Sequence, residues 1–321
     1  MEDDLELALE AALAGADVAM GFFAVVADLR HERKLDGSVV TEADRAVEAT
    51  IRAVLTAAYP ADAVLGEEGG ERAGSGGRRW IIDPIDGTAL FVAGDDRWLV
   101  LLALEEAGEI TIGVAVVPVQ RRLWWARRGG GAWEAAYGGA PRRITVAPGG
   151  DDLAAARLGV LPVFDDPATG ANIVPKAPGV AAPLLAITPA LPWTLHPPLQ
   201  VARGDLDVAV QTSGMVWDFA ATSLIVAEAG GVYRGLDGSR RPRPGPSVFA
   251  RSGALAEAAI AAAGVSAVAS GGAAAGASAV VDGGAAALGA DAVGEGVDQA
   301  EQRAQRQHQA DDAEDPAQDR G

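Results

Sequence analysis

The stretch from residue 97 to residue 133 constrains the fold most, because it alternates apolar runs with turn signals. Its two parts read RWLVLLALEEAGEITIGVAVVP, residues 97–118, and RLWWARRGGGAW, residues 122–133. Runs of apolar, β-branched and aromatic residues separated by Gly-containing turns predict consecutive antiparallel strands. Another strand, RRWIIDPIDGT at residues 78–88, precedes them and ends in a turn with Pro and Gly. The chain is therefore predicted to contain an antiparallel sheet.

Two helices are expected ahead of this sheet. Apolar residues recur at helical spacing over residues 5–29, and Ala dominates between them. After a short extended segment at residues 39 and 40, a second helix is expected from Thr41 to about Ala58, before Pro60. DAVLGEEGG then reads as a short strand ending in an acidic turn. Helices packed on an antiparallel sheet make up the predicted first domain, residues 1–150.

A second domain of α/β type is expected over residues 151–264. AARLGVLPVF and DLDVAVQ read as buried strands, and WDFAATSLIVAEAGG reads as a helix closed by a Gly pair. The acidic remainder, residues 265–321, is rich in Ala and Gly and has almost no large apolar residue. Burial of such a segment would not offset the entropy lost on ordering, so we expect a disordered tail with no role in function.

Charge and composition exclude several classes of function. The formal net charge of −18, with no basic stripe to offset it, argues against nucleic acid or an acidic membrane as partner. No cysteine is present, which excludes disulfides and thiolate zinc sites. The N-terminus is acidic where a signal peptide is basic, and no apolar run reaches the length of a membrane span. We expect a cytoplasmic protein that recruits any anionic substrate through a bound cation.

Acidic residues stand at four places where strands or helices are expected to begin or end. Each place alone has a structural interpretation: a capping box for Thr41 and Asp44, solvated turns at two places, and the first turn of a helix for Asp218. Carboxylates at the ends of successive strands can also converge in space. The full set is Asp44, Glu67 with Glu68, Asp83 with Asp86, and Asp218.

Convergence of these carboxylates predicts a magnesium site. Magnesium prefers hard oxygen ligands and keeps waters and substrate phosphate in its coordination shell. Asp83 can bridge two ions, while the rigid Pro84 exposes the Ile85 carbonyl. Gly87 and Thr88 open a short helix whose N–H groups suit a phosphate, and two metals suit phosphoryl transfer. In this arrangement Glu68 completes one metal site, and Asp86 with Asp218 the other.

Three motifs in the same order resemble the inositol monophosphatase family of magnesium-dependent phosphatases. They are GEE at 66–68, DPIDGT at 83–88 and WDFAATSLIVAEAGG at 217–231. VTEAD at 40–44 is similar to the N-terminal acidic motif of the family, and the resemblance spans residues 5–262. It implies an αβαβα layered sandwich, within the α/β (α+β) class. Many members of the family are dimers, so a homodimer is one possible assembly.

The resemblance also implies a role for each site residue. Two or three Mg²⁺ ions are held, the first by Glu68, Asp83 and the Ile85 carbonyl, and the second by Asp83, Asp86 and Asp218. Asp44 and Thr88 activate the nucleophilic water, and Asp86, Gly87 and Thr88 bind the phosphate. The implied substrate is a small phosphate monoester.

Within the family, residues 91–133 most resemble the histidinol-phosphate phosphatase branch, which makes histidinol phosphate the first expected substrate. Four positions bear on specificity: Ala89 replaces a larger polar or basic residue, Trp193 and His196 lie where that branch has an aromatic-Gly-Asp-aromatic segment, and Gln211 replaces the glutamate of inositol-specific members. A Trp between prolines more often packs a loop than binds a ligand. Inositol, sugar and nucleoside monophosphates remain alternative substrates. A non-catalytic metal-binding relative is the alternative of another class.

Overall fold

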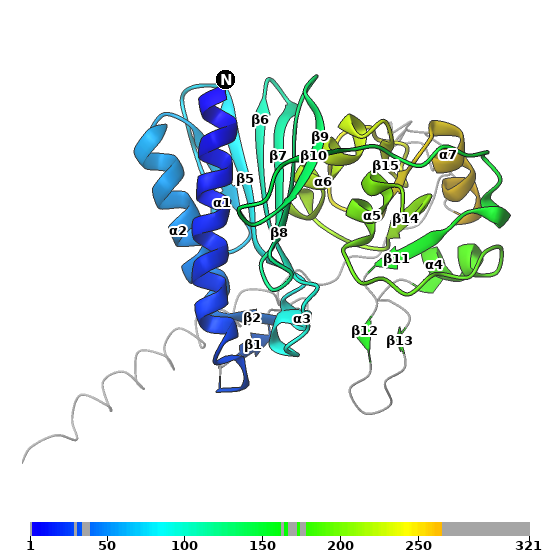
Figure 1. The fold of residues 1–321 in the computed structure, drawn as a ribbon, viewed down its shortest axis with the longest axis horizontal. Coiled ribbons are helices and arrows are strands. Elements are labelled where there is room, and N and C mark those ends of the chain that lie inside the picture. Colours follow the sequence, from blue (N-terminus) through cyan, green and yellow to red (C-terminus); the bar gives the residue numbers. More distant parts are fainter. Residues whose placement is uncertain are drawn as a thin grey trace, which may run out of the picture. The chain divides into compact units, whose positions relative to one another are not determined.

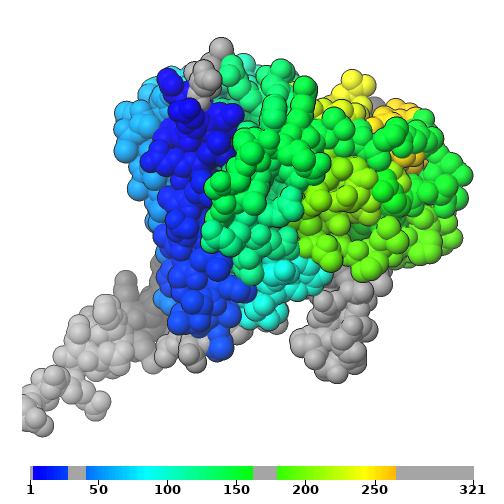
Figure 2. Space-filling model, viewed as in Figure 1, coloured from blue at the N-terminus to red at the C-terminus, as the bar shows by residue number. Residues whose placement is uncertain are grey.

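Helices and sheets alternate in five layers in the computed structural model of this chain (Figure 1). The structure describes residues 2–28, 31–33, 39–161, 164–165, 172–173 and 178–264. The predicted disordered tail, residues 265–321, lies outside the described residues. In the space-filling view the chain runs from the blue N-terminal helix to the orange C-terminal helix across the same layers (Figure 2). The αβαβα sandwich implied by the family resemblance is confirmed.

The first layer consists of α1 (Glu2–Phe23) and α2 (Glu42–Ala58). α1 ends six residues earlier than predicted and is followed by a short 3₁₀ helix, η1 (Val26–Asp28). Five alanines of α1 are fully buried, and a Cβ on Gly15 would lie 2.7 Å from the Ile51 Cδ1 of α2. Small side chains therefore let the two helices approach each other closely.

The second layer is an eight-stranded sheet with the order β10-β9-β8-β7-β6-β5-β3-β4. All neighbours pair antiparallel, as predicted, except β3 and β5, which are parallel. Helices cover both faces, so most residues of the central strands are buried. The strands are β3 (Ala63–Gly66), β4 (Gly70–Arg72), β5 (Arg78–Asp86), β6 (Leu99–Glu106), β7 (Glu109–Val117), β8 (Arg122–Arg127), β9 (Gly131–Ala136) and β10 (Arg142–Ile144).

The remaining layers come from the second half of the chain. α5 (Pro197–Arg203) and α6 (Val216–Glu228) lie between the eight-stranded sheet and a four-stranded sheet of order β11-β14-β16-β15. That sheet is built from β11 (Leu158–Leu161), β14 (Val208–Gln211), β15 (Val232–Gly235) and β16 (Ser247–Ala250), and α4 (Pro178–Leu185) and α7 (Gly253–Ala262) form the outer layer.

A few short elements complete the described residues. They are α3 (Thr88–Val92), the 3₁₀ helix η2 (Leu153–Ala155), the pair β1 (His31–Arg33) and β2 (Val39–Thr41), and the pair β12 (Phe164–Asp165) and β13 (Asn172–Ile173). Among the described residues, no helix combines the length and apolar character needed to cross a membrane.

One hydrophobic cluster connects the two halves of the chain. It joins Trp124 of the first sheet, Phe219 of α6 and Phe249 of the second sheet. A Cβ on Gly113 of β7 would lie 2.5 Å from the Ala221 carbonyl oxygen, so α6 packs directly against the first sheet. The division into domains at residue 150 stays a prediction. α6 packs against strands of both the first and the second sheet.

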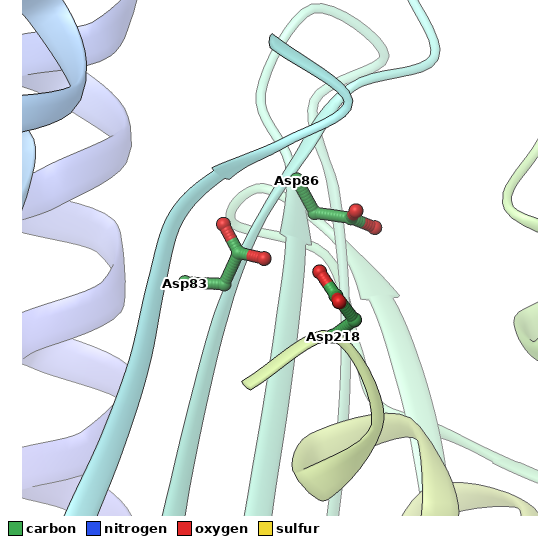
Figure 3. Close-up of side chains that lie close together, drawn as sticks. All are labelled: Asp83, Asp86 and Asp218. Carbon is green, nitrogen blue, oxygen red and sulfur yellow. The ribbon is translucent and has the colours of Figure 1, made fainter. Parts of the chain in front are cut away.

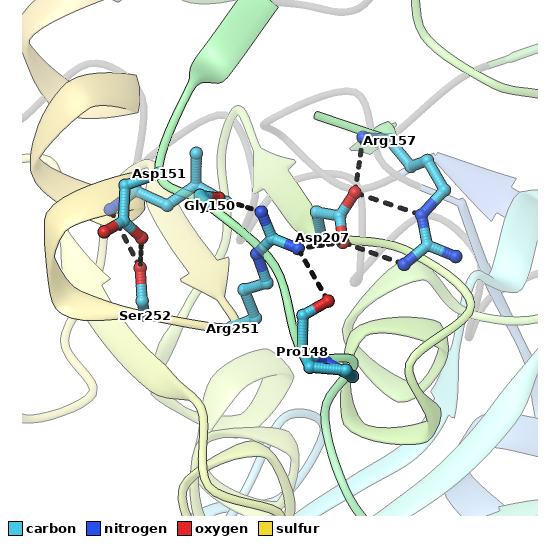
Figure 4. Close-up of polar contacts among 8 residues, drawn as sticks. Pro148, Gly150, Asp151, Arg157, Asp207, Arg251 and Ser252 are labelled. Atoms are coloured by element: carbon cyan, nitrogen blue, oxygen red, sulfur yellow. Dashed lines mark hydrogen bonds and ion pairs between the residues drawn. The ribbon is translucent and has the colours of Figure 1, made fainter. Parts of the chain in front are cut away.

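A buried carboxylate ties the linker between the two sheets to the second sheet (Figure 4). Asp207 is 4% exposed and accepts hydrogen bonds from the Arg157 backbone and guanidinium at 2.8–3.0 Å and from Arg251 Nη1 at 3.1 Å. Arg251 in turn donates to the carbonyls of Pro148 and Gly150. One aspartate therefore positions two arginines, and one of these holds the linker.

We expect Asp207→Ala to destabilise the fold by about 3–5 kcal/mol, because two partly buried guanidinium groups would lose their carboxylate. Asp205→Ala, which removes a half-exposed carboxylate 3.3 Å from Arg203, is the matched control and should change stability by less than about 1 kcal/mol. Urea unfolding measures both. Equal, small losses in the two variants would contradict the role assigned to Asp207.

The Asp207 network should also fail in acid. Burial alone would raise the pKa of Asp207, but the hydrogen bonds and charges of Arg157 and Arg251 hold it below the usual 3.8. A depressed folded-state pKa stabilises the fold above the unfolded-state value, and this stabilisation is lost as the pH falls through the folded-state value. In unfolding measurements below pH 4, wild type should therefore lose more stability than Asp207→Asn.

Candidate metal centre and active site

Three aspartates converge where β5 ends and α6 begins (Figure 3). One carboxylate oxygen from each of Asp83, Asp86 and Asp218 lies within 4.8 Å of the other two. Residues 83 and 86 would point to opposite faces of a regular strand, because side chains alternate. The pairing of β5 with β6 shifts register between them, since Asp83 is opposite Leu101 and Asp86 is opposite Leu99. This bulge turns both carboxylates toward Asp218.

The electrostatics of this cluster favour binding of a cation, because buried carboxylates that repel one another are unfavourable in their charged form. Asp83 is 1% exposed, and among the described residues its carboxylate meets no N–H or hydroxyl donor; its one hydrogen-bond contact is a proton shared with the Asp218 carboxylate. Burial, followed by the charges of Glu67, Asp86 and Asp218, raises the pKa of Asp83 well above its usual value. Burial and the charge of Asp86 also raise the pKa of Asp218 to about 7, although the Met215 backbone N–H donates to it. Hard carboxylate oxygens fit Mg²⁺.

Asp44 combines a structural contact with a contact to the site. Its Oδ2 accepts from the Thr41 N–H at 2.8 Å and the Thr41 hydroxyl at 2.7 Å, which completes the predicted capping box at the start of α2. Its Oδ1 lies 3.1 Å from the Thr88 hydroxyl, which is also 3.1 Å from the Ile85 carbonyl oxygen. Thr88 has one proton, so it donates to Asp44 whenever the Ile85 carbonyl binds something else.

Glu68 lies outside the cluster of three aspartates. Its charge acts on Asp44, whereas the charge of the neighbouring Glu67 acts on Asp83 and Asp218. The turn after β3 therefore presents one carboxylate to each part of the site. The sequence analysis selected Glu68 as the metal ligand, and the structure adds Glu67 as a second candidate.

The sequence analysis missed Glu48, which holds this turn in place. Glu48 is 2% exposed on α2, and its carboxylate accepts from the backbone N–H groups of Glu68 at 2.7 Å and Gly69 at 2.8 Å. It also accepts from Arg52 Nε at 2.7 Å. A Cβ on Gly66 would lie 2.4 Å from the Glu48 carboxylate, so the turn needs glycine there. The signal available in the sequence was the position of Glu48 one turn after Asp44 on the same helix.

The segment expected to bind phosphate follows the aspartates directly. Gly87 has φ +85° in the left-handed region and caps the short helix α3, which begins at Thr88. The Leu90 N–H donates to the Gly87 carbonyl at 2.8 Å, whereas the N–H groups of Gly87 and Thr88, at the start of the helix, have no acceptor one turn back and can serve an anion beside Asp86. Ala89 is half-buried in α3, and its methyl group offers no polar contact.

Of the predicted specificity residues, His196 lies closest to the metal cluster. Its Nε2 is 3.2 Å from Asp86 Oδ2, the side chain is buried, and Nδ1 has no hydrogen-bond partner. Gln211 is 6% exposed at the end of β14, and its Oε1 also has no partner. Trp193 instead packs within the structure: it is 6% exposed and the Arg97 guanidinium lies 4.5 Å from its ring centroid. Trp193 therefore packs a loop, the more frequent role of such a residue.

Comparison with known proteins identifies the family. The Inositol monophosphatase family matches residues 1–160 and 197–270. A histidinol-phosphatase of Mycobacterium tuberculosis is 38% identical over 252 residues, which are 77% of this chain and 92% of that protein. A Streptomyces griseus protein named glucose-1-phosphate thymidylyltransferase is 37% identical over 246 residues, 75% of this chain and 88% of that protein.

A solved structure, the extragenic suppressor protein suhB of Bartonella henselae, matches with a TM-score of 0.67 and 25% identity, over 81% of this chain and 98% of that one. Fold, motif order and these similarities agree. The chain belongs to the inositol monophosphatase family of phosphoric monoester hydrolases.

Proposed function

We propose that this enzyme hydrolyses a small phosphate monoester with Mg²⁺ and a metal-activated water, and that histidinol phosphate is its substrate. The observation that carries the proposal is the buried carboxylate of Asp83, which meets no N–H or hydroxyl donor among the described residues and lies close to the carboxylates of Asp86 and Asp218. Such an arrangement is unfavourable unless a cation occupies it. The similarity to a histidinol-phosphatase supports the choice of substrate.

The residues at the site suit this chemistry. Asp83, Asp86, Asp218, Glu68 and the Ile85 carbonyl would hold two or three Mg²⁺ ions. When bound, these ions neutralise the phosphate charge and lower the pKa of a bound water. The Thr88 hydroxyl donates to Asp44, which leaves its lone pairs free to accept a hydrogen bond from that water.

Thr88 takes part in both phosphate binding and proton transfer. The N–H groups of Gly87 and Thr88 orient the phosphate, next to Asp86. As the water oxygen bonds to phosphorus, the bond from phosphorus to the alcohol oxygen breaks; the proton of the water would move by way of the Thr88 hydroxyl to Asp44, and the departing alkoxide would take a proton from solvent water. Burial raises the pKa of Asp44, which makes it a better proton acceptor than an exposed aspartate.

Alcohols other than histidinol are also compatible with the site. The family match leaves out residues 161–196, which include Trp193 and His196. Ala89 and Gln211 also depart from the residues of related phosphatases noted above. An inositol, sugar or nucleoside monophosphate is therefore the alternative substrate, and a non-catalytic metal-binding relative is the alternative from another class.

A phosphate-release assay with Mg²⁺ tests the substrate. The panel is histidinol phosphate, inositol 1-phosphate, adenosine 5′- and 3′-phosphates and fructose 1,6-bisphosphate. We expect kcat/KM for histidinol phosphate to exceed the others by at least about tenfold, which corresponds to about 1.4 kcal/mol of transition-state binding. A faster alternative would replace histidinol as product, and formation of pyrophosphate from dTTP and glucose 1-phosphate would favour nucleotidyl transfer instead.

Asp83→Asn tests whether the aspartate cluster is the active site. The substitution keeps the shape of the side chain and removes the charge that would bridge the metals, so turnover should fall at least about a thousandfold. Asp96→Asn, in an exposed position ten residues beyond Asp86, is the control and should retain full activity. A phosphatase activity that survives in Asp83→Asn would place the chemistry elsewhere.

The stability of the metal-free protein should fall as the pH rises from about 4 to about 7. In this range the folded state holds a proton at Asp218, whose pKa is raised to about 7, while the unfolded chain has released it near 3.8. The folded state binds more protons, so a rising pH disfavours it. Melting temperatures in EDTA should show the fall, and millimolar Mg²⁺ or Asp218→Asn should reduce it. A fall of the same size with Mg²⁺ present would contradict a metal at this site.

Glu48→Gln should raise the Mg²⁺ concentration needed for half-maximal activity by about tenfold. All three groups that contact the carboxylate are donors, so an amide NH₂ would face a donor and loosen the turn that carries Glu68. Glu42→Gln, on the exposed face of the same helix, is the control. A loss of kcat at saturating Mg²⁺ without a change in Mg²⁺ affinity would mean that Glu48 does not act through the metal.

A further inference from the structure

A cavity of about 390 Å³ lies along α6. Its wall comes from the β6–β7 turn at Gly108, from Arg128 after β8, from β15 and from the loop after it. α6 contributes Val216 at its start and residues from Ser223 to its C-terminal end. Asp83, Asp86 and Asp218 are not among the lining residues, so the cavity lies outside the aspartate cluster, although Val216 is two residues from Asp218.

The cavity concentrates positive charge in a chain whose formal net charge is −18. Arginine is the residue best suited to phosphate, because its planar guanidinium presents two parallel donors and stays charged at any relevant pH. A volume of about 390 Å³ is within the range of small-molecule sites. The arginines that line the cavity are Arg128, Arg234, Arg240, Arg241 and Arg243.

Only one of the three carboxylates that line the cavity pairs with these arginines. Glu228 accepts hydrogen bonds from the backbone N–H groups of Gly129 at 2.8 Å and Gly131 at 2.9 Å. Glu105 pairs with Arg79, outside the cavity, at 2.7 Å. Glu109 forms ion pairs with two arginines of the cavity wall.

The loop after β15 supplies the arginines with the weakest pairing. Arg243 has its carboxylate partner, Asp237, only at 3.9 Å. Arg240 is exposed and forms no ion pair with any residue in the described part of the chain. Positive charge therefore remains uncompensated on this side of the cavity.

An unpartnered donor belongs to the same wall. Tyr233 is 4% exposed; the Arg243 backbone N–H faces its buried hydroxyl oxygen, and the hydroxyl proton has no acceptor among the described residues. Its ring is held by Phe249, whose centroid lies 5.2 Å away, and by Phe219 at 5.9 Å. Burial raises the pKa of the Tyr233 hydroxyl to about 12, so it keeps its proton and can donate it. A buried donor without an acceptor is unusual unless a ligand or water supplies one.

We propose that this cavity binds a small anion with two or more phosphate groups, held by Arg240, Arg243 and the Tyr233 hydroxyl. The cluster of guanidinium groups supplies the charge complementarity and paired donors that phosphates need. The hydroxyl supplies a further, fixed donor. The proposal is independent of the substrate of the active site, because no lining residue belongs to the metal cluster.

Calorimetric titration of the full-length protein with inorganic pyrophosphate in EDTA tests this site. EDTA removes the cations through which the active site would hold phosphate, and the bare aspartates there repel the anion. We expect saturable binding that Asp83→Asn leaves unchanged. Succinate, a dianion without phosphate, should bind at least tenfold more weakly.

Two variants and a control assign the binding to the cavity. The double variant Arg240→Gln/Arg243→Gln alters exposed side chains and should weaken pyrophosphate binding at least tenfold, and Tyr233→Phe should weaken it severalfold. Arg121→Gln, which removes an exposed arginine in the turn between β7 and β8, should leave the affinity unchanged. The proposal is overturned if pyrophosphate does not bind at millimolar concentration, if the double variant binds like wild type, or if succinate binds as well.

Discussion

The mutual repulsion of Asp83, Asp86 and Asp218 is the constraint on which the rest of this site depends. The fold holds these carboxylates close together, with the His196 imidazole beside Asp86. Two backbone features make this possible: the bulge in β5, and the close packing of α6 on the sheet at Gly113. Both belong to well-packed parts of the core, so packing energy holds the charges in place.

The layered architecture explains why the three aspartates meet where they do. β5 lies in the first sheet, and α6 is packed between that sheet and the second. The aspartates of β5 and of α6 are therefore brought together by a single hydrophobic interface, which includes Phe219 one residue after Asp218. A small shift of α6 would alter the spacing of the three carboxylates. A change that loosens this interface should therefore also change the geometry of the site.

Residues of α2 serve both the helix and the site. Asp44 caps its own helix with one carboxylate oxygen and meets Thr88 with the other. Glu48, one turn later, binds the backbone of the turn that carries Glu67 and Glu68. The structural interpretation of Asp44 is confirmed, and the functional one stays a prediction compatible with it, because a carboxylate has two oxygens and enough lone pairs for both tasks.

The extent to which the sequence predicts the structure follows from the range of each interaction. α2, β5 and the capping box depend on local patterns, and the sequence predicts them with nearly correct bounds; for β6 to β9 it predicts antiparallel strands within residues 97–133 without individual bounds. The end of α1, the parallel pairing of β3 with β5 and the role of Glu48 depend on contacts between distant residues, which local patterns do not contain. Asp83 and Asp86 show where prediction from local patterns ends. Regular strand alternation would place their side chains on opposite faces of the sheet, and only the bulge between them brings both to the same side. Motif order revealed their partnership, whereas the position of His196 against Asp86 depends on how α5 packs, and no short-range signal predicts it.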